Sequence, residues 1–243
     1  MSAKVYGLSV SPWTERALWA LDHHGVSYRY REYVPMVEAP LLKWWGRALA
    51  RDKATVPLYT DGAVVLGDSL DIMVQADEAG DGAPLESRAA GQWAQRVEPV
   101  LCAVRARVAH RMLADQEALT EAARMAVPDA LAPLCKPLTA TAARYLAKKY
   151  GFDAAKEPDD VAVLRPFLDE VRQQLGTGPY LGDSFAAADI IAATVLHGLS
   201  PHKGRYQTMG PATRRLWARP ELAQEYGDLM AWRDGLYARH RKT

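Results

Sequence analysis

Three features are scarce or absent in this sequence, and each absence excludes a class of protein. Only two of the 243 residues are cysteines, Cys102 and Cys135, which excludes a disulfide-rich scaffold and a CxxC redox pair. Basic and acidic residues nearly balance, 30 against 29, whereas nucleic-acid-binding domains carry a basic excess. The longest apolar run, near residues 190–196, is far shorter than the roughly 20 residues of a membrane helix. The opening residues do not form a secretory signal, so we expect a cytoplasmic protein that binds neither nucleic acid nor membrane.

Residue patterns that bind metals or activate common nucleophiles are missing as well. The six histidines show no HExxH or other metal-ligand spacing, so we expect no metal site. The sequence has no GxSxG nucleophile elbow and no glycine-rich phosphate loop. Any chemistry must therefore come from a different arrangement of residues.

The first third of the chain alternates short strand patterns with helical patterns, as α+β proteins do. Asp61-Gly62, between two strand patterns, predicts a hairpin. Gly25 and Gly80 follow helical patterns and predict their ends. The predicted order is βαβαββα, with strands over residues 4–10, 26–34, 56–60 and 63–66 and helices over 12–24, 41–49 and 69–79.

A polar connector containing glycine and proline follows these elements, at residues 80–85. Beyond it the patterns are helical, and the segment 186–199 is apolar on all sides, which predicts a central helix. We therefore predict an α+β protein with an N-terminal domain of residues 1–80, a linker of residues 81–85 and an all-helical domain of residues 86–243.

Ser11 and Pro12 lie where the first predicted strand enters the first helix. The first amides of a helix lack internal partners and favour a negative charge, including a thiolate. Ser11 and Thr14 have the spacing of a CxxC pair but carry hydroxyls, which can donate a hydrogen bond to the thiolate of another molecule. The alternative is that Ser11 serves only as the helix N-cap.

Two further segments can contribute to the same site. The Val56-Pro57 step at the start of the third strand predicts an edge with an unpaired backbone, able to pair with an extended peptide. Asp68-Ser69 opens the third helix, where a hydroxyl and free amides can bind a carboxylate and Asp68 an ammonium. Each segment also has a simpler interpretation: Pro57 can be an ordinary edge-strand proline, and Asp68 can be a plain helix N-cap. Together with Ser11 they predict a receptor for a small thiol peptide.

These segments carry a resemblance to a known family. The run SPWTER at residues 11–16, the Val56-Pro57 step, GDSLDI at residues 67–72 and YLGDSFAAADIIAA at residues 180–193 resemble the cytosolic glutathione transferases, serine-type and bacterial-like. The resemblance extends over essentially the whole chain. It implies a thioredoxin-like N-terminal domain, an all-helical C-terminal domain, a homodimer and glutathione as cosubstrate.

The resemblance also implies roles for individual residues. Ser11 corresponds to the catalytic serine of the serine-type classes, or to the cysteine of the omega-like ones. Val56 corresponds to the backbone partner of the glutathione cysteine and Pro57 to the cis-proline. Asp68 and Ser69 would hold the γ-glutamyl end. The family often has a basic or amide residue before the Val-Pro step; here that position is Thr55, and Lys53 lies two residues earlier. Trp13 would flank the peptide, and the wall for a hydrophobic substrate would be formed by Trp13, Trp93, Arg96, Val97 and Val100.

The function expected from these residues is glutathione transfer in detoxification. Ser11 and the helix N-terminus would lower the pKa of the glutathione thiol, and the thiolate would attack a small hydrophobic electrophile. Two alternatives remain open. A glutathione-dependent isomerase or lyase would use the same thiol and release it unchanged. A non-catalytic binding or interaction protein could keep the fold without the reaction.

Overall fold

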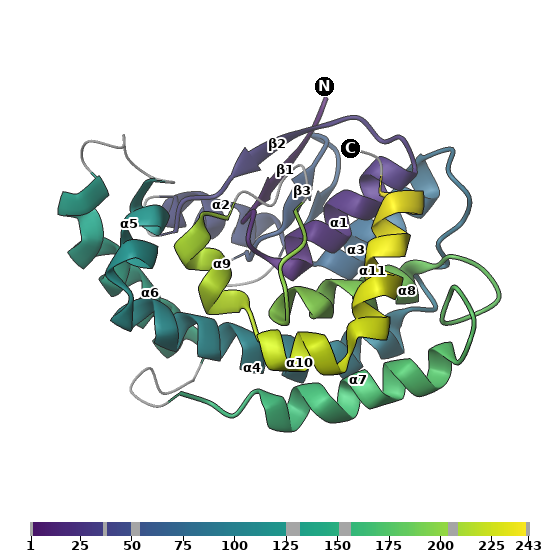
Figure 1. The fold of residues 1–243 in the computed structure, drawn as a ribbon. Coiled ribbons are helices and arrows are strands. Elements are labelled where there is room, and N and C mark those ends of the chain that lie inside the picture. Colours follow the sequence, from purple (N-terminus) through teal and green to yellow (C-terminus); the bar gives the residue numbers. More distant parts are fainter. Residues whose placement is uncertain are drawn as a thin grey trace.

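The protein is described by a computed structural model that covers residues 2–35, 38–49, 54–124, 132–150, 157–203 and 209–241. Its N-terminal part has the predicted order of elements (Figure 1). The bounds are β1 Ala3–Gly7, α1 Pro12–His23, β2 Tyr28–Glu32, α2 Ala39–Ala48, β3 Leu58–Thr60, β4 Val65–Leu66 and α3 Ser69–Ala79. The strands are shorter than predicted, since residues 9 and 10 already form a turn.

The four strands form one mixed sheet in the order β2-β1-β3-β4. β1 runs parallel to β2 and antiparallel to β3, and β3 forms a hairpin with β4. Asp61 closes this hairpin by accepting hydrogen bonds from the amides of Ala63 and Val64. The α+β class and the thioredoxin-like N-terminal arrangement are therefore confirmed.

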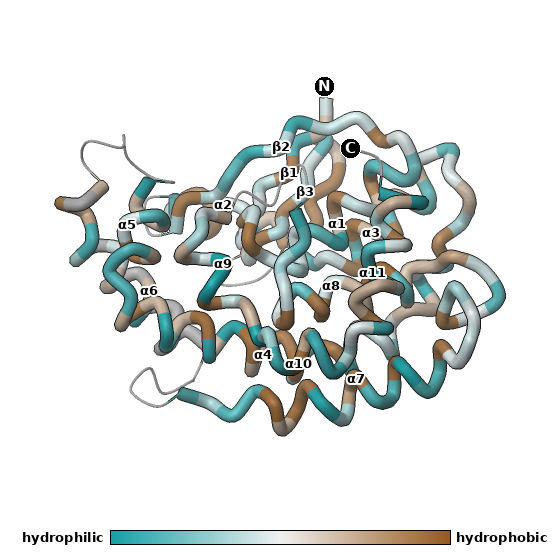
Figure 2. The backbone as a smooth tube through the Cα atoms, viewed as in Figure 1, coloured by the Kyte–Doolittle hydropathy of each residue, from teal (hydrophilic) through white to brown (hydrophobic). Residues whose placement is uncertain are grey.

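The remaining elements within the described residues are helices (Figure 1). Hydrophobic and hydrophilic residues alternate along α7 at helical spacing (Figure 2). None of the described helices is both long and apolar enough to span a membrane. Their bounds are α4 Gly91–Ala114, α5 Gln116–Arg124, η1 Ala132–Cys135, α6 Lys136–Tyr150, α7 Val161–Leu175, α8 Ala187–Val195, η2 Leu196–Gly198, α9 Pro211–Trp217, α10 Pro220–Glu225 and α11 Gly227–His240.

Helix α8 lies at the centre of the helical part, and nearly all of its residues are buried. Its N-cap position is Ala186, which has no side-chain acceptor, and Asp189 takes over part of the capping. The Asp189 carboxylate accepts hydrogen bonds from the amides of Ala186 (2.9 Å) and Leu181 (2.8 Å). The segment before α8 is thereby fixed to its first turn.

The connector between α3 and α4 is held by Asp77. Its carboxylate accepts hydrogen bonds from the amides of Leu85 and Ser87, both 2.8 Å, and contacts His24 Nε2 at 2.7 Å. Leu85 in turn accepts a hydrogen bond from the amide of Ala187, at the start of α8 (2.7 Å). The connector therefore packs against both parts of the chain, and a domain division at residues 81–85 stays a prediction.

Replacing Asp77 with alanine is expected to destabilise the protein by about 2–3 kcal/mol, because two backbone amides lose their acceptor. Burial raises the pKa of Asp77, but the hydrogen bonds from Ser87 and Leu85 outweigh it and keep the pKa below its ordinary value. Its stabilisation is therefore present at neutral pH and lost as the pH falls through that lowered pKa. Urea unfolding at several pH values measures both effects. Asp81→Ala, at an exposed acid in the same connector, is the control and should cost less than about 0.5 kcal/mol.

Candidate active site

Ser11 is the N-cap of α1, at the carboxyl end of β1. The amide of Thr14 donates to Ser11 Oγ over a long 3.4 Å. The hydroxyl proton has no acceptor within the residues that the structure describes, and the side chain is half-buried. A hydroxyl can accept and donate at the same time. Ser11 can therefore cap the helix and still donate a hydrogen bond to a ligand.

The Val56 edge lies next to the N-terminus of α3. The Val56–Pro57 peptide is cis, and Pro57 is buried. Among the described residues, the backbone N–H and C=O of Val56 have no hydrogen-bond partner. Thr55 Oγ1 donates to the carbonyl of Gly67 at 3.1 Å. This bond joins the unpaired edge to the turn that begins α3.

The N-terminus of α3 presents one exposed and one buried polar side chain. Asp68 is the N-cap, and its carboxylate accepts a hydrogen bond from the amide of Leu70 at 2.8 Å. Ser69 is only 2% exposed, and its Oγ accepts a hydrogen bond from Arg16 Nε at 2.8 Å. Arg16 belongs to α1, so this bond joins the two helix N-termini at the point where Ser11 and Asp68 lie.

Arg16 is the main site residue that sequence reasoning missed. It is 3% exposed, and its Nη1 lacks a hydrogen-bond partner among the described residues. Burial lowers the pKa of Arg16 to about 10, while the negative charges of Glu98 and Asp68 act to raise it. The guanidinium is therefore still charged at neutral pH. A buried cation with an unused donor is a binding group for an anion.

Trp13, in the first turn of α1, meets a polar face of α4. Its indole N–H donates to Glu98 Oε2 at 2.9 Å, and the guanidinium of Arg105 lies 5.0 Å from its ring centroid. Cys102 lies between these two charged residues, its Sγ 3.5 Å from Glu98 Oε1 and 3.2 Å from Arg105 Nη2. Burial raises the pKa of the Cys102 thiol. The α4 surface that contacts Trp13 therefore carries polar and charged side chains.

The other four residues predicted to form the wall for a hydrophobic substrate pack against other parts of the helical region. Trp93, Val97 and Val100 are each at most 9% exposed and belong to the main hydrophobic core, where Trp93 contacts Phe167 of α7. Arg96 pairs with Glu170 of α7 at 2.6 Å. A substrate wall formed by these residues stays a prediction, although Trp93, Val97 and Val100 have little free surface in this structure. Lys53 lies outside the described residues.

Residues 10–79 match the family described as glutathione S-transferase, N-terminal domain. That match spans α1, the Val56 edge and α3, the elements that hold the site. Residues 10–79 are a glutathione S-transferase N-terminal domain. This match confirms the family resemblance over residues 10–79, and no curated protein matches the chain.

Solved structures share the fold of the glutathione S-transferase domain and of the helices that follow it. A theta-class glutathione S-transferase from Xanthomonas axonopodis pv. citri, with glutathione bound, is 20% identical and has a TM-score of 0.51, covering 98% of this chain and 93% of its own. Glutathione S-transferase I from mais, in complex with an atrazine glutathione conjugate, is 18% identical, with a TM-score of 0.56 and coverage of 98% and 93%. A beta-etherase from Sphingobium sp. strain SYK-6 is 16% identical, with a TM-score of 0.57 and coverage of 98% and 96%.

Proposed function

We propose that this protein is a glutathione transferase whose site is built from Ser11, the Val56 edge and the N-terminus of α3. The observation that carries the proposal is the pair of hydrogen bonds that joins these segments, Arg16 to Ser69 and Thr55 to Gly67. They bring together one group for each part of an extended thiol peptide. The glutathione S-transferase domain match supports the same activity.

The binding roles follow from the chemistry of each group. The free backbone of Val56 would pair with the cysteinyl residue of glutathione as an added strand. The γ-glutamyl carboxylate would bind at the α3 N-terminus, to Ser69 and the charged Arg16, and its ammonium to Asp68. Pro57 and Thr55 shape this edge, while Trp13 borders the thiol position. Lys53 remains a predicted contact for the glycyl end.

The reaction would begin with loss of the thiol proton to solvent. Hydrogen bonding from Ser11 Oγ and the positive end of α1 would lower the pKa of the thiol and increase the thiolate population at neutral pH. The sulfur then forms a bond to an electrophilic carbon, and a leaving group departs with its electron pair. The protein contributes position and charge stabilisation and forms no covalent bond itself.

Two other functions use the same site. The beta-etherase among the structural neighbours is named for ether cleavage, so a lyase or isomerase reaction that consumes or regenerates glutathione is the second candidate. A non-catalytic binding protein is the third. The cytoplasmic location, the homodimer and the detoxification role expected from the sequence belong to this proposal, as does the hydrophobic electrophile.

The proposal is tested by binding and turnover. The protein is expected to be retained on immobilised glutathione and to conjugate a generic aromatic electrophile. Retention with no conjugation, but with cleavage of an aryl ether, would favour the lyase reading. If calorimetry detects no glutathione binding, the transferase and lyase proposals both fail.

Arg16→Met is expected to raise the KM for glutathione about 10-fold or more, because the γ-glutamyl carboxylate loses a charged donor. Arg16→Lys keeps the charge but not the planar pair of donors, so its KM for glutathione should lie between that of the wild type and that of Arg16→Met. Steady-state kinetics at varied glutathione concentration measures the effect. Arg105→Met removes a similar charge from the α4 face and is the control; an equal rise in KM would show that general electrostatics, and not Arg16 contact, was lost.

A further inference from the structure

The chain between β1 and α1, residues 8–11, places Ser11 and is held from two sides. On the helix side, the amide of Leu8 donates to Thr14 Oγ1 at 3.2 Å, and the amide of Ser11 donates to the carbonyl of Leu8 at 2.9 Å. On the sheet side, the loop is held by a carboxylate of the neighbouring strand. That carboxylate belongs to Glu32, the last residue of β2.

Glu32 makes three hydrogen bonds with groups around this loop. Its Oε1 accepts from both the amide (2.9 Å) and the hydroxyl (3.1 Å) of Ser9, and its Oε2 accepts from the hydroxyl of Tyr30 at 2.5 Å. Burial raises the pKa of Glu32 even though the Tyr30 and Ser9 donors lower it. Burying a carboxylate costs free energy unless its oxygens accept hydrogen bonds. The hydrogen bonds to both Glu32 oxygens offset this cost and hold the donor groups in place.

The backbone around Glu32 is itself rigidly placed. Glu32 pairs with Gly7 in the parallel register of β1 and β2, and the amide of Tyr33 donates to the carbonyl of Gly7 at 2.7 Å. A side chain on Gly7 would meet Thr14 at 2.4 Å, so β1 and α1 approach closely here. The loop thus begins from a fixed point on the sheet, and Glu32 holds Ser9, the second residue of the loop.

Ser9 is not itself the hydroxyl that serves a ligand. It is 4% exposed, and its proton is donated to Glu32. The pair can therefore affect a reaction only through the loop. We infer that Glu32 is a positioning residue that, through Ser9, sets the place of the Ser11 hydroxyl. This inference rests on the proposed function, since that function gives Ser11 its role.

Removing the carboxylate takes away the acceptor that Glu32 provides to the amide and the hydroxyl of Ser9. The loop is then no longer tied to β2 through Glu32, and we expect Ser11 to shift with it. A misplacement of about 1 Å at a reacting group lowers a rate by up to about 100-fold. The groups that bind the peptide, on the Val56 edge and α3, do not contact Glu32 within the hydrogen bonds described above, so peptide affinity should change little.

The test compares Glu32→Ala with Glu32→Gln. Glu32→Ala is expected to lower kcat about 10-fold to 100-fold, to change the KM for glutathione less than about 2-fold, and to raise the pKa of the bound glutathione thiol, read from thiolate absorbance. Glu32→Gln keeps one oxygen for Ser9, and its amide N–H can donate to the Tyr30 oxygen. It should therefore restore most of the rate and the thiol pKa.

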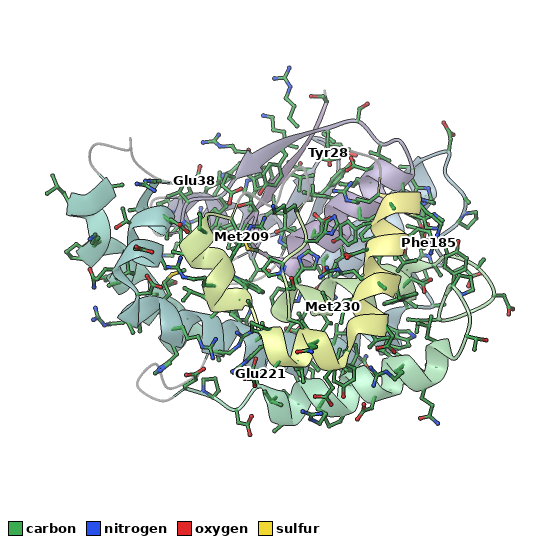
Figure 3. All side chains as sticks on the ribbon, viewed as in Figure 1. Tyr28, Glu38, Phe185, Met209, Glu221 and Met230 are labelled. Atoms are coloured by element: carbon green, nitrogen blue, oxygen red, sulfur yellow. The ribbon has the colours of Figure 1, made fainter. Side chains whose placement is uncertain are left out.

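Glu38→Ala is the matched control. Glu38, labelled in Figure 3, also accepts a backbone hydrogen bond, from Val34 at 2.9 Å, and pairs with Arg31, but it makes no bond to the loop. Its kcat and thiol pKa should equal those of the wild type. If Glu32→Ala keeps the wild-type kcat and thiol pKa, Glu32 is only structural and the inference is overturned.

A second measurement does not depend on activity. Amide hydrogen exchange over residues 8–14 should be about 10-fold faster in Glu32→Ala than in wild type and close to wild type in Glu32→Gln. Unchanged exchange in Glu32→Ala overturns the inference even if the rate falls. The wild type, measured alongside, separates the two claims: absence of glutathione binding in the wild type overturns the proposed function, whereas a working wild type and an unaffected Glu32→Ala overturn only the role of Glu32.

Discussion

Ser11→Ala is expected to lower kcat/KM for glutathione conjugation by about 100-fold, the usual effect of removing one hydrogen bond to a developing or stabilised anion. The proposed cause is the loss of the only hydroxyl that α1 presents at its N-cap. Without it, the pKa of the bound thiol rises toward its ordinary value and the thiolate population at neutral pH falls. A pH–rate profile should therefore shift to higher pH in the variant.

The same substitution also removes a helix cap, which costs about 1 kcal/mol of stability. Two variants separate the cap from the chemistry. Ser11→Gly lacks the hydroxyl but costs only a few tenths of a kcal/mol of stability at an N-cap. Ser11→Thr keeps both the helix cap and the hydroxyl donor. Turnover should be lost in Ser11→Gly and retained in Ser11→Thr. If instead the activity of all three variants follows their stability, Ser11 is a cap alone.

Elements whose signals are local were predicted well. Ser11-Pro12 begins α1, Asp68 begins α3 and Asp61-Gly62 forms the hairpin, because each depends on side-chain bonds to amides two or three residues away. The hydrogen bond of a cap or turn is complete within a few residues. Such features can therefore be predicted from one sequence without knowledge of the tertiary fold.

The polar partners across the site could not be predicted in this way. Arg16 bonds to Ser69 and Glu32 to Ser9, and these partners come from different elements, so no residue spacing reveals them. A signal for Arg16 did exist. It is a charged residue within a helix whose neighbours Ala17 and Leu18 are fully buried, and such a residue needs a specific partner.

The substrate wall shows a different limit. Trp93, Val97 and Val100 are predicted to line it because clefts between domains are common ligand sites, but their apolar side chains are buried in the core. Hydrophobicity alone does not distinguish a residue that lines a site from one that packs against another helix. The residues of α4 that reach Trp13 are instead Glu98 and Arg105. Their position beside Trp13 depends on the tertiary arrangement of α1 and α4, which the sequence pattern does not give.

The C-terminal end of the chain is joined to α1 by a buried ionic network. α11 lies beside α1 (Figure 1), and Trp19 of α1 packs against Tyr237 with ring centroids 4.3 Å apart. Glu15 is 3% exposed; its Oε1 lies 3.0 Å from Arg241 Nε and 3.3 Å from the hydroxyl of Tyr237. Tyr237 donates to Glu15, so His197, 2.8 Å away, must donate its Nε2 proton to the Tyr237 oxygen.

These charges are balanced only while Arg241 is present. Burial raises the pKa of Glu15, and Arg241 is the largest influence that lowers it. Arg241 also pairs with Asp22, two turns along α1. Arg241→Met would leave Glu15 as a buried carboxylate with a single hydroxyl donor. Removing one partner of a buried ion pair typically costs about 3–5 kcal/mol, and we expect a loss of that size at neutral pH.

The stability lost in Arg241→Met should depend on pH in a defined direction. A carboxyl whose pKa is higher in the folded protein than in the unfolded chain binds a proton more tightly when folded, so folding stability increases as the pH falls. Removing Arg241 raises the folded pKa of Glu15 further. The deficit of Arg241→Met relative to wild type should therefore be greatest near neutral pH and shrink as the pH falls toward the ordinary carboxyl value of 4.5.

Urea unfolding across this pH range tests the expectation, with two comparisons. Arg239→Met removes the same charge from an exposed position on α11 and should change stability by less than about 0.5 kcal/mol. In a Glu15→Gln background, Arg241→Met should cost about 2 kcal/mol less than in the wild type, because no buried charge is left unpaired. A pH-independent deficit, equal in both backgrounds, would mean that Arg241 acts through packing and Asp22, and that the charge of Glu15 is balanced by other groups.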